Sequence, residues 1–210
     1  MLQYYQQMKH SVKDALLHFK TADPVLYSVA VTVEIPEVTS HDNYFLELYD
    51  SIVSQQLSVK AASTIMGRLK RLYPNEEITP EYTLTLDAQK MRDAGNSFSK
   101  IKYLKDLSQK VIDGTLKLEK FKDLSEDEIM KELLLVKGIG PWTAEMFIMS
   151  SLGRPDVFSF GDQGLKNAMK NIYKLEAHAT LEEALFISGK WSPYRTYACR
   201  ILWKSLNNMP

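Results

Sequence analysis

The chain has 210 residues, of which 45% are hydrophobic and 25% are charged, and its 26 basic residues balance its 26 acidic residues. These values are typical of a soluble globular protein with one sizeable core or two small lobes, and no apolar run reaches the length of a membrane span. The one cysteine, Cys199, excludes an internal disulfide and a four-cysteine zinc or iron–sulfur site. Because the first residues also lack a secretory signal, we expect an intracellular protein, in the cytoplasm or nucleoid of a prokaryote or the nucleus of a eukaryote.

The first half of the chain predicts short helices in close succession. Asp23 stands directly before a proline, which is typical of a helix start. Apolar residues recur at helical spacing over 45–52 and again over 62–72. A further short helix is predicted over 87–94. The run 27–35, YSVAVTVEI, is the one segment that resembles a strand, and it fits helix and loop as well.

The second half continues the same pattern. A helix is predicted from 97 to about 114, with Ile112 among its inward-facing residues. Capping boxes begin helices at Ser125 and Thr180, each with a glutamate three residues later. A last helix is predicted over 192–206, beginning at a Ser-Pro pair. The sequence therefore predicts an all-α bundle of short helices with short joints.

Basic residues gather in two places although the net charge is zero. No acid lies between 51 and 73, whereas one acid, Asp106, accompanies the basic residues of 97–110. The basic residues of these two segments are Lys60, Arg68, Lys70 and Arg71, followed by Lys100, Lys102, Lys105 and Lys110. Two interpretations stay open: solvated helix faces, or part of a nucleic-acid footprint.

The segment 133–149, LLLVKGIGPWTAEMFIM, interrupts a helix with two closely spaced glycines and restarts one at Pro141. Glycines in such a joint let backbone N–H groups project from the turn and from the start of the next helix, which makes an anion site suited to a DNA phosphate. The alternative is a tight turn between two helices in which glycine serves only as a cap.

Four segments in order resemble the helix-hairpin-helix DNA glycosylases. They are IVSQQLSVKAASTIMGRL, the hairpin LLLVKGIGPWTAEMF, GRPDVFSFGDQGLKNAM and WSPYRTYACRILW. The closest branch is the 3-methyladenine DNA glycosylase II (AlkA/Mag) type. The resemblance implies one glycosylase unit over 1–210 with a family-like core over about 44–206. It implies two lobes, 41–136 and 1–40 plus 137–210, with the hairpin (about 126–151) at the cleft between them.

The resemblance assigns the chemistry to Asp162, which matches the family's catalytic aspartate. A carboxylate beside the sugar would stabilise an oxocarbenium-like transition state, as general base or by its charge alone. The competing interpretation is that Asp162 merely caps the following helix. Asp156 is the other carboxylate of this segment, at a position where the family has a structural acid.

The resemblance also implies DNA contacts. The joint Gln55-Gln56-Leu57 matches the element that fills the gap after a base is flipped out, with Gln56 the best match for the wedge. Phosphate contacts are implied for Lys137, Gly138, Gly140 and Lys166. The main-chain carbonyls of Leu134, Val136 and Ile139 match those that hold a structural sodium or potassium ion, and no cofactor is required. The expected partner is double-stranded DNA with alkylated bases, bound by a monomer without contact with a membrane.

Trp142 stands where family members that also cut the DNA backbone carry a lysine. An indole cannot form the Schiff base of that reaction, so a monofunctional glycosylase is implied. Aromatic faces attract cationic bases such as 3-methyladenine and 7-methylguanine, and the implied pocket residues are Trp142, Trp191, Phe158 and Phe160. Met146 and Gln163 replace tyrosines of some relatives. The alternatives are a glycosylase for a neutral lesion such as hypoxanthine, a non-catalytic DNA-binding module, and a helical protein-interaction bundle.

Overall fold

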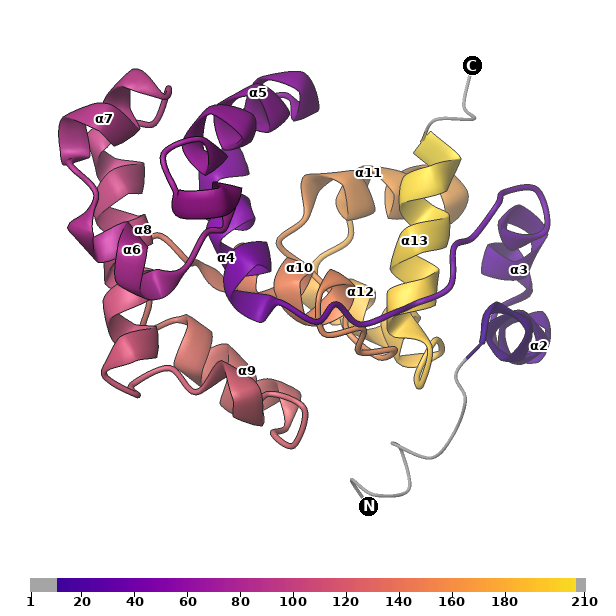
Figure 1. The fold of residues 1–210 in the computed structure, drawn as a ribbon. Coiled ribbons are helices and arrows are strands. Elements are labelled where there is room, and N and C mark those ends of the chain that lie inside the picture. The colour runs from indigo at the N-terminus through magenta and orange to yellow at the C-terminus, as the bar shows by residue number, and fades with distance from the viewer. Residues whose placement is uncertain (1–10, 207–210) are drawn as a thin grey trace. The chain divides into compact units, whose positions relative to one another are not determined.

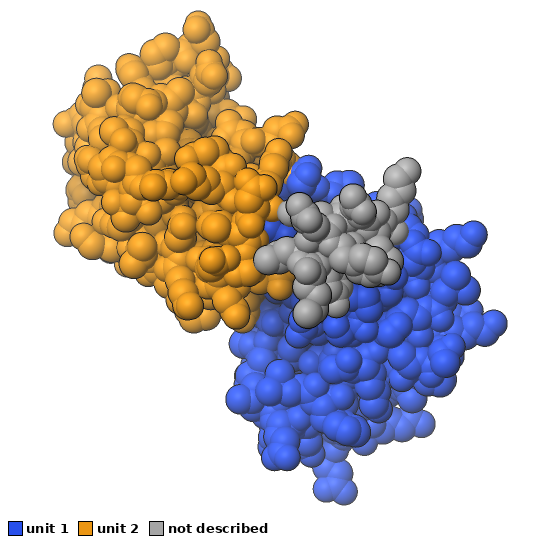
Figure 2. All heavy atoms as spheres, turned by 90° about the horizontal axis from the view of Figure 1, so that it is seen from below, with its two compact units in different colours: residues 1–40, 148–210 blue, residues 41–147 orange. Residues whose placement is uncertain are grey.

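The computed structural model describes residues 11–206, and within that range it contains helices, turns and loops but no strand. The fold class predicted from the sequence is therefore confirmed. The chain forms two compact units, shown in different colours in Figure 2: unit 2 comprises residues 41–147, and unit 1 comprises 1–40 together with 148–210. None of the helices in the described part of the chain is long and apolar enough to cross a membrane.

Unit 2 is a bundle around one central helix, α8. Its elements are α4 (Tyr44–Ser54), α5 (Val59–Lys70), the 3-10 turn η1 (Pro74–Glu76), α6 (Pro80–Thr85), α7 (Ala88–Asp93), α8 (Phe98–Ile112), the 3-10 turn η2 (Leu118–Lys120), α9 (Glu126–Leu133) and the first turns of α10 (Pro141–Ser150). Helices α4, α6 and α7 all pack on α8. Its side chains Ile101, Leu104 and Leu107 are fully buried, and burial of each stabilises the fold by roughly 1.5–3 kcal/mol.

A chain of hydroxyl groups crosses the core of unit 2. The phenol oxygens of Tyr49 and Tyr73 lie 2.9 Å apart, and Thr83 Oγ1 lies 2.9 Å from the Tyr73 oxygen. Thr83 then donates to the carbonyl of Thr79 at 2.7 Å, so every member of the chain has a partner. Buried hydroxyls that are all satisfied fix the mutual position of α4, η1 and α6 without leaving an unpaired polar group.

Unit 1 joins the two ends of the described chain. Its helices, seen in Figure 1, are α2 (Val12–Ala22), α3 (Pro24–Ala30), α11 (Gln163–Ile172), α12 (Leu181–Gly189) and α13 (Arg195–Leu206). Helix α13 packs on both α11 and α3. The buried carboxylate of Asp23 caps α3 and also accepts hydrogen bonds from Trp191 Nε1 (2.9 Å) and Tyr173 Oη (2.7 Å). Asp23 thereby ties α3 to the C-terminal part of the unit, 150 and 168 residues away.

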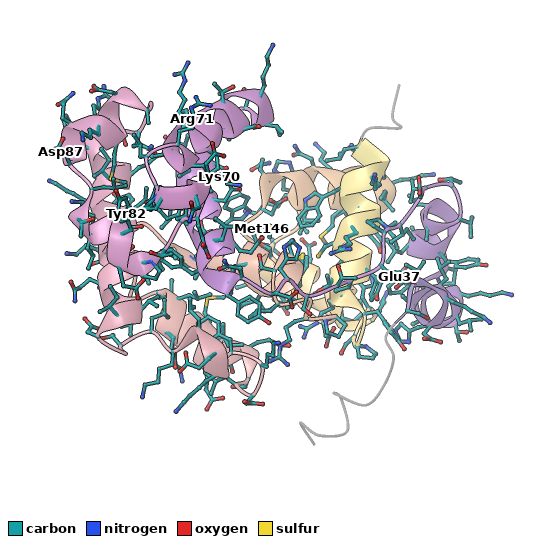
Figure 3. The ribbon with its side chains drawn as sticks, viewed as in Figure 1. Glu37, Lys70, Arg71, Tyr82, Asp87 and Met146 are labelled. Carbon is teal, nitrogen blue, oxygen red and sulfur yellow. The ribbon has the colours of Figure 1, made fainter. Side chains whose placement is uncertain are left out.

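The segment after α3 runs along α13 as an extended strap. Arg200 Nη1 on α13 donates to the carbonyls of Pro36 (3.1 Å) and Glu37 (2.8 Å). The carboxylate of Glu37, labelled in Figure 3, accepts the backbone N–H of Val12 and the hydroxyl of Tyr197. The strand-like run 27–35 is the end of α3 followed by a turn and loop, and no strand is present in the described chain.

Local signals placed most helix starts correctly, and tertiary contacts moved the others. The capping boxes at Ser125 and Thr180 and the cap at Asp23 are all confirmed. The last helix begins at Arg195 and not at Ser192, because residues 191–193 form a turn that precedes it. The prediction that Ile112 faces inward is wrong: its side chain is 44% exposed in the final turn of α8.

The boundary between the units falls inside α10 and not before it. The sequence predicted a break after residue 136, whereas the structure keeps residues 137–147 with unit 2. The cause is the ring of Phe147, which contacts Tyr44 at 5.9 Å and Phe121 at 6.1 Å in edge-on geometry. The hairpin turn, residues 134–140, and the first turns of α10 therefore belong to unit 2.

Candidate functional site

The hairpin turn lies between Leu133, where α9 ends, and Pro141, where α10 begins. Asp106 on α8 anchors this turn through both carboxylate oxygens. Its Oδ2 accepts the Lys137 backbone N–H at 2.9 Å, and its Oδ1 lies 3.5 Å from Lys137 Nζ. Burial alone would raise the pKa of Asp106, but hydrogen bonds from Lys110 and the Lys137 N–H, with the charges of both lysines, lower it. An ionised carboxylate thus anchors the turn, while the Lys137 ammonium stays exposed.

The two glycines of the hairpin have different environments. Gly138 has a left-handed backbone (φ +84°), and a Cβ there would overlap the ring of Tyr103. Gly140 has no such φ, and a Cβ there would meet no protein atom within 4 Å. Its carbonyl accepts the Ala144 N–H at 3.0 Å as α10 begins. Glycine at 138 is explained by the fold, whereas the fold gives no reason for glycine at 140, where the backbone faces open space.

The joint between α4 and α5 lies directly against the hairpin. Gln55 Nε2 donates to the carbonyl of Gly138 at 2.8 Å, joining residues 83 positions apart. On the other side, Lys100 Nζ donates to the carbonyls of Val53 and Gln55, both at 2.7 Å. Burial lowers the pKa of this ammonium group. The amide of Gln55 is therefore used to position the joint, and two motifs predicted separately from the sequence meet within unit 2.

The next two residues of the joint point outward. Gln56 has a left-handed backbone (φ 58°), which is uncommon for a residue other than glycine or asparagine, and its side chain is exposed. Leu57 is 38% exposed, although it is apolar. Strained residues held by a rigid surround are concentrated at functional sites. The geometry fits the expected wedge at Gln56 with Leu57 beside it.

Three of the lysines of α8 contact other parts of unit 2. Lys100 binds the end of α4, Lys105 donates to the carbonyl of Leu86 at 2.8 Å, and Lys110 pairs with Asp106 at 2.8 Å. These contacts give all three residues a role in the fold, and the interpretation of the segment as a nucleic-acid footprint stays a prediction. Each ammonium group caps carbonyls at the end of a neighbouring segment or neutralises a carboxylate, which the sequence alone could not reveal.

Asp162 combines the two roles that the sequence left open. It is the N-cap of α11, and its Oδ1 accepts the Leu165 N–H at 2.7 Å. The same oxygen accepts Trp203 Nε1, on α13, at 2.9 Å. The residue is 9% exposed. A nearly buried carboxylate whose position is fixed by the start of a helix and by an indole is suited to act as a preorganised negative charge.

Trp203 is the residue that the sequence reasoning missed. It lies 41 positions after Asp162, and its single indole N–H is directed at the carboxylate. The side chain is half-buried and lines a hollow of about 380 Å³ in unit 1 with Pro36, Ser150, Arg200 and Lys204. Gly164 allows this approach, since a Cβ there would lie 3.2 Å from the indole. No local pattern connects these residues in the sequence.

The structure places Trp191 in the core of unit 1. The residue is 0% exposed, and its Nε1 donates to Asp23 at 2.9 Å. Phe158 packs edge-on against it with ring centroids 5.6 Å apart. Phe160 is half-buried with the Lys166 ammonium 4.5 Å from its ring centroid, so Lys166 and Phe160 form a cation–π pair. In this arrangement Trp191 supports the fold and is enclosed from solvent, and the half-buried Phe158 packs against it.

Asp156 is held by four hydrogen bonds at the start of α13. Asp156 forms a bidentate pair with Arg195, at 2.7 and 3.0 Å, and also accepts the Ser192 hydroxyl and the Arg195 N–H. It is a structural carboxylate at the start of α13.

Trp142, in the first turn of α10 in unit 2, is 48% exposed and leaves much of its indole accessible.

The carbonyls expected to hold a monovalent ion lie in the hairpin turn. Leu134 is the C-cap of α9, where carbonyls carry partial negative charge. The Val136 carbonyl accepts the Ile139 N–H at 3.1 Å, which uses one of its two lone pairs. Carbonyl oxygens of this kind can replace the hydration shell of sodium or potassium, so the residues present fit such an ion.

Helices joined by a glycine hairpin, a projecting joint beside it and a capped aspartate after it define a base-excision type of DNA repair protein. The model of the HhH-GPD superfamily of base excision DNA repair proteins matches residues 50–193, and the chain belongs to this superfamily.

Relatives extend the match to most of the chain. The Bacillus subtilis protein YfjP, provisionally named a DNA-3-methyladenine glycosylase, is 35% identical over 161 residues, 74% of this chain and 56% of its own length. The chain thus spans little more than half of that relative.

Two solved structures cover more. The DNA-3-methyladenine glycosidase of Bacillus halodurans is 36% identical with a TM-score of 0.79, over 90% of this chain and 88% of that one. The 3-methyladenine DNA glycosylase of Schizosaccharomyces pombe, in complex with abasic DNA, is 32% identical with a TM-score of 0.79, over 92% and 97%.

Proposed function

We propose that this chain is a monofunctional DNA glycosylase that flips alkylated purines of the 3-methyladenine and 7-methylguanine type out of duplex DNA and removes them by hydrolysis. The observation that carries the proposal is the nearly buried carboxylate of Asp162, held by the Leu165 and Trp203 N–H groups, in a member of a base-excision family. The relatives named above support the choice of alkylated bases. The enzyme acts as a monomer on double-stranded DNA.

The reaction breaks the bond between the sugar C1′ and the base nitrogen, and the bonding electrons leave with the base. An alkylated purine leaves readily because it carries a positive charge that departure neutralises. The sugar becomes oxocarbenium-like, and the Asp162 carboxylate stabilises its positive charge. A water oxygen then bonds to C1′ and releases a proton, which Asp162 or solvent accepts. The products are the free base and an abasic site.

The hairpin and the joint deliver the nucleotide. Backbone N–H groups at Gly138 and Gly140 and the Lys137 ammonium bind a phosphate near the start of α10. The carbonyls of Leu134, Val136 and Ile139 would hold a monovalent ion, which would supply positive charge to that phosphate. Gln56, with Leu57, fills the gap that the flipped base leaves, which offsets the few kcal/mol lost by unstacking. Gln55 holds this wedge in register with the hairpin through its bond to Gly138.

Trp142 contributes to the preference for cationic bases and explains the absence of strand cleavage. Its half-exposed indole offers a face to a cationic base, an attraction of roughly 0.5–2 kcal/mol. It carries no amine, so no Schiff base forms at this position and the strand stays uncut. Lys166, on α11 four residues after the N-cap Asp162, neutralises a phosphate of the bound strand in this proposal.

The test is single-turnover release of free bases from methylated duplex DNA, with the wild type beside Asp162→Asn. Asparagine is an equally good helix N-cap, so the variant keeps the fold. Release of 3-methyladenine or 7-methylguanine by the wild type, loss of release in the variant and intact strands in both would support the proposal. Wild-type release that persists in Asp162→Asn would remove Asp162 from the mechanism, and cleaved strands would exclude the monofunctional assignment. DNA binding without base release would favour a neutral lesion or a binding module.

A further inference from the structure

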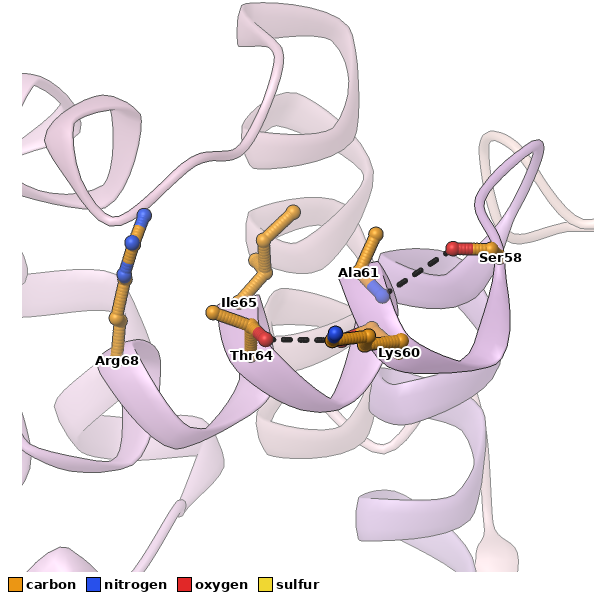
Figure 4. Close-up of a pocket in the computed structure, with 6 residues that line it drawn as sticks. All are labelled: Ser58, Lys60, Ala61, Thr64, Ile65 and Arg68. Atoms are coloured by element: carbon orange, nitrogen blue, oxygen red, sulfur yellow. Dashed lines mark hydrogen bonds between the residues drawn. The ribbon is translucent and has the colours of Figure 1, made fainter.

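Helix α5 carries a groove that no part of the proposed reaction uses. It has a volume of about 390 Å³ and begins at Ser58, two residues after Gln56. Figure 4 shows its lining residues along one side of the helix; they are Ser58, Lys60, Ala61, Thr64, Ile65 and Arg68. Lys60, Thr64 and Arg68 are spaced four residues apart, so they share one face of α5. The two cations are about 12 Å apart along the axis, from 1.5 Å of rise per residue.

The charges in this groove have no partner within the part of the chain that the structure describes. Among residues 11–206 the side chains of Lys60 and Arg68 take part in no hydrogen bond or ion pair. No acidic residue lines the groove or lies between 51 and 73. By contrast, three lysines of α8, Lys100, Lys105 and Lys110, are engaged with carbonyls or with Asp106. Cations that the fold leaves unneutralised on one face are suited to an external polyanion.

The opposite face of α5 differs in chemistry. The hollow there, about 540 Å³, includes Asp50 as well as Lys70, and apolar residues such as Leu57, Val59 and Met66. Lys70 lies near Asp50 and helps to lower that carboxyl's pKa, although burial and the charge of Glu47 raise it overall. Figure 3 places Lys70 and Arg71 at the far end of the helix from the joint. The positive charges of Lys60 and Arg68 attract a phosphate to their face of the helix. The negative charge of Asp50 repels a phosphate from the opposite face.

We infer that this groove is a second phosphate-binding surface, which follows the DNA backbone away from the wedge for a span of three to four nucleotides, about 12 Å at 3.4 Å each. The inference rests on the proposed function, since it assigns the same duplex as partner. Lys60 and Arg68 supply the charges, and the hydroxyls of Ser58 and Thr64 lie between and beside them. The contacts are to the backbone, so they strengthen binding without reading sequence.

The test is the salt dependence of binding to a duplex with a reduced abasic site, for wild type, Lys60→Gln, Arg68→Gln and the double variant. Glutamine is a good helix former, so α5 persists. Each lost phosphate contact lowers the slope of log Kd against log salt by about 0.9. Between 50 and 200 mM salt the wild type should lose about 12-fold more affinity than the double variant. Lys70→Gln, on the opposite face of the same helix, is the matched control and should keep the wild-type slope.

A second measurement locates the contact. Single neutral methylphosphonate linkages at the contacted phosphates should weaken binding by the wild type but not by the double variant. The linkage and the two substitutions remove the same interaction, so their effects do not add. The single-turnover rate of base release at saturating enzyme should stay within twofold of the wild type. An unchanged salt slope in the double variant, or an equal change in Lys70→Gln, would overturn the inference while leaving the glycosylase proposal intact. A wild type that binds no DNA would overturn both.

Discussion

Alanine at Gly140 separates what the hairpin does for the fold from what it does for a ligand. The structure offers no steric reason for glycine at this position, because an added Cβ meets no atom within 4 Å and the backbone is not left-handed. We therefore expect Gly140→Ala to leave the free energy of unfolding unchanged or to raise it by about 0.4–1 kcal/mol, through the smaller entropy of the unfolded chain. The same methyl group would stand where a phosphate must approach the backbone.

The expected loss of binding follows from that geometry. A hydrogen bond to a charged group is worth about 1.5–3 kcal/mol, which corresponds to a 10- to 150-fold weaker Kd for an abasic duplex. Gly138→Ala is the matched contrast. Its left-handed backbone alone costs about 1–2 kcal/mol with a side chain present, and the overlap with Tyr103 adds to that. This variant should lose stability, and its melting temperature should fall.

The assay measures thermal unfolding and fluorescence anisotropy with labelled abasic duplex for both variants and the wild type. The reasoning requires Gly140→Ala to melt at or above the wild-type temperature and to bind DNA at least tenfold more weakly. Unchanged DNA binding by a stable Gly140→Ala protein would refute the phosphate role of the hairpin. It would leave the turn as a connection between two helices.

Three further predictions follow. Trp203→Phe keeps an aromatic ring but removes the N–H to Asp162, so single-turnover release should fall about 10- to 150-fold while abasic-DNA binding stays within threefold. The control, Trp191→Phe, should lower the melting temperature and leave the rate of folded enzyme unchanged. Equal rate losses in the two variants would contradict the assignment. Trp142→Ala should reduce release of cationic 7-methylguanine more than that of neutral hypoxanthine, and parallel losses would exclude a cation–π contribution. The pKa of Asp106 is lowered, so the stability that its ionised form provides is present above the ordinary pKa of 3.8 and is lost as pH falls through the lowered pKa. Asp106→Asn should therefore lower the free energy of unfolding, measured in urea, by roughly 1–3 kcal/mol at pH 7 and by less at pH 3.

Features that depend on neighbours in the chain could be predicted from the sequence. Capping boxes at Ser125 and Thr180 and the cap at Asp23 join groups three residues apart, and the hairpin is a continuous segment. The role of Asp162 as a cap follows from its place before α11. In each case the interacting atoms are separated by one turn of backbone, so the residue order fixes the contact.

Tertiary packing decided the rest, because the contacts join residues far apart in the chain. Only the fold directs the indole of Trp203 at Asp162, 41 positions away, and encloses that of Trp191 beside Asp23, 168 positions away. The two tryptophans lie on the same C-terminal segment, and no local pattern distinguishes the one that contacts the carboxylate. Likewise the bond from Gln55 to Gly138 and the ring contacts of Phe147 keep the hairpin turn and the first turns of α10 in unit 2. The sequence by itself determined which chemical groups the protein has, and the packing of helices determined which of them meet.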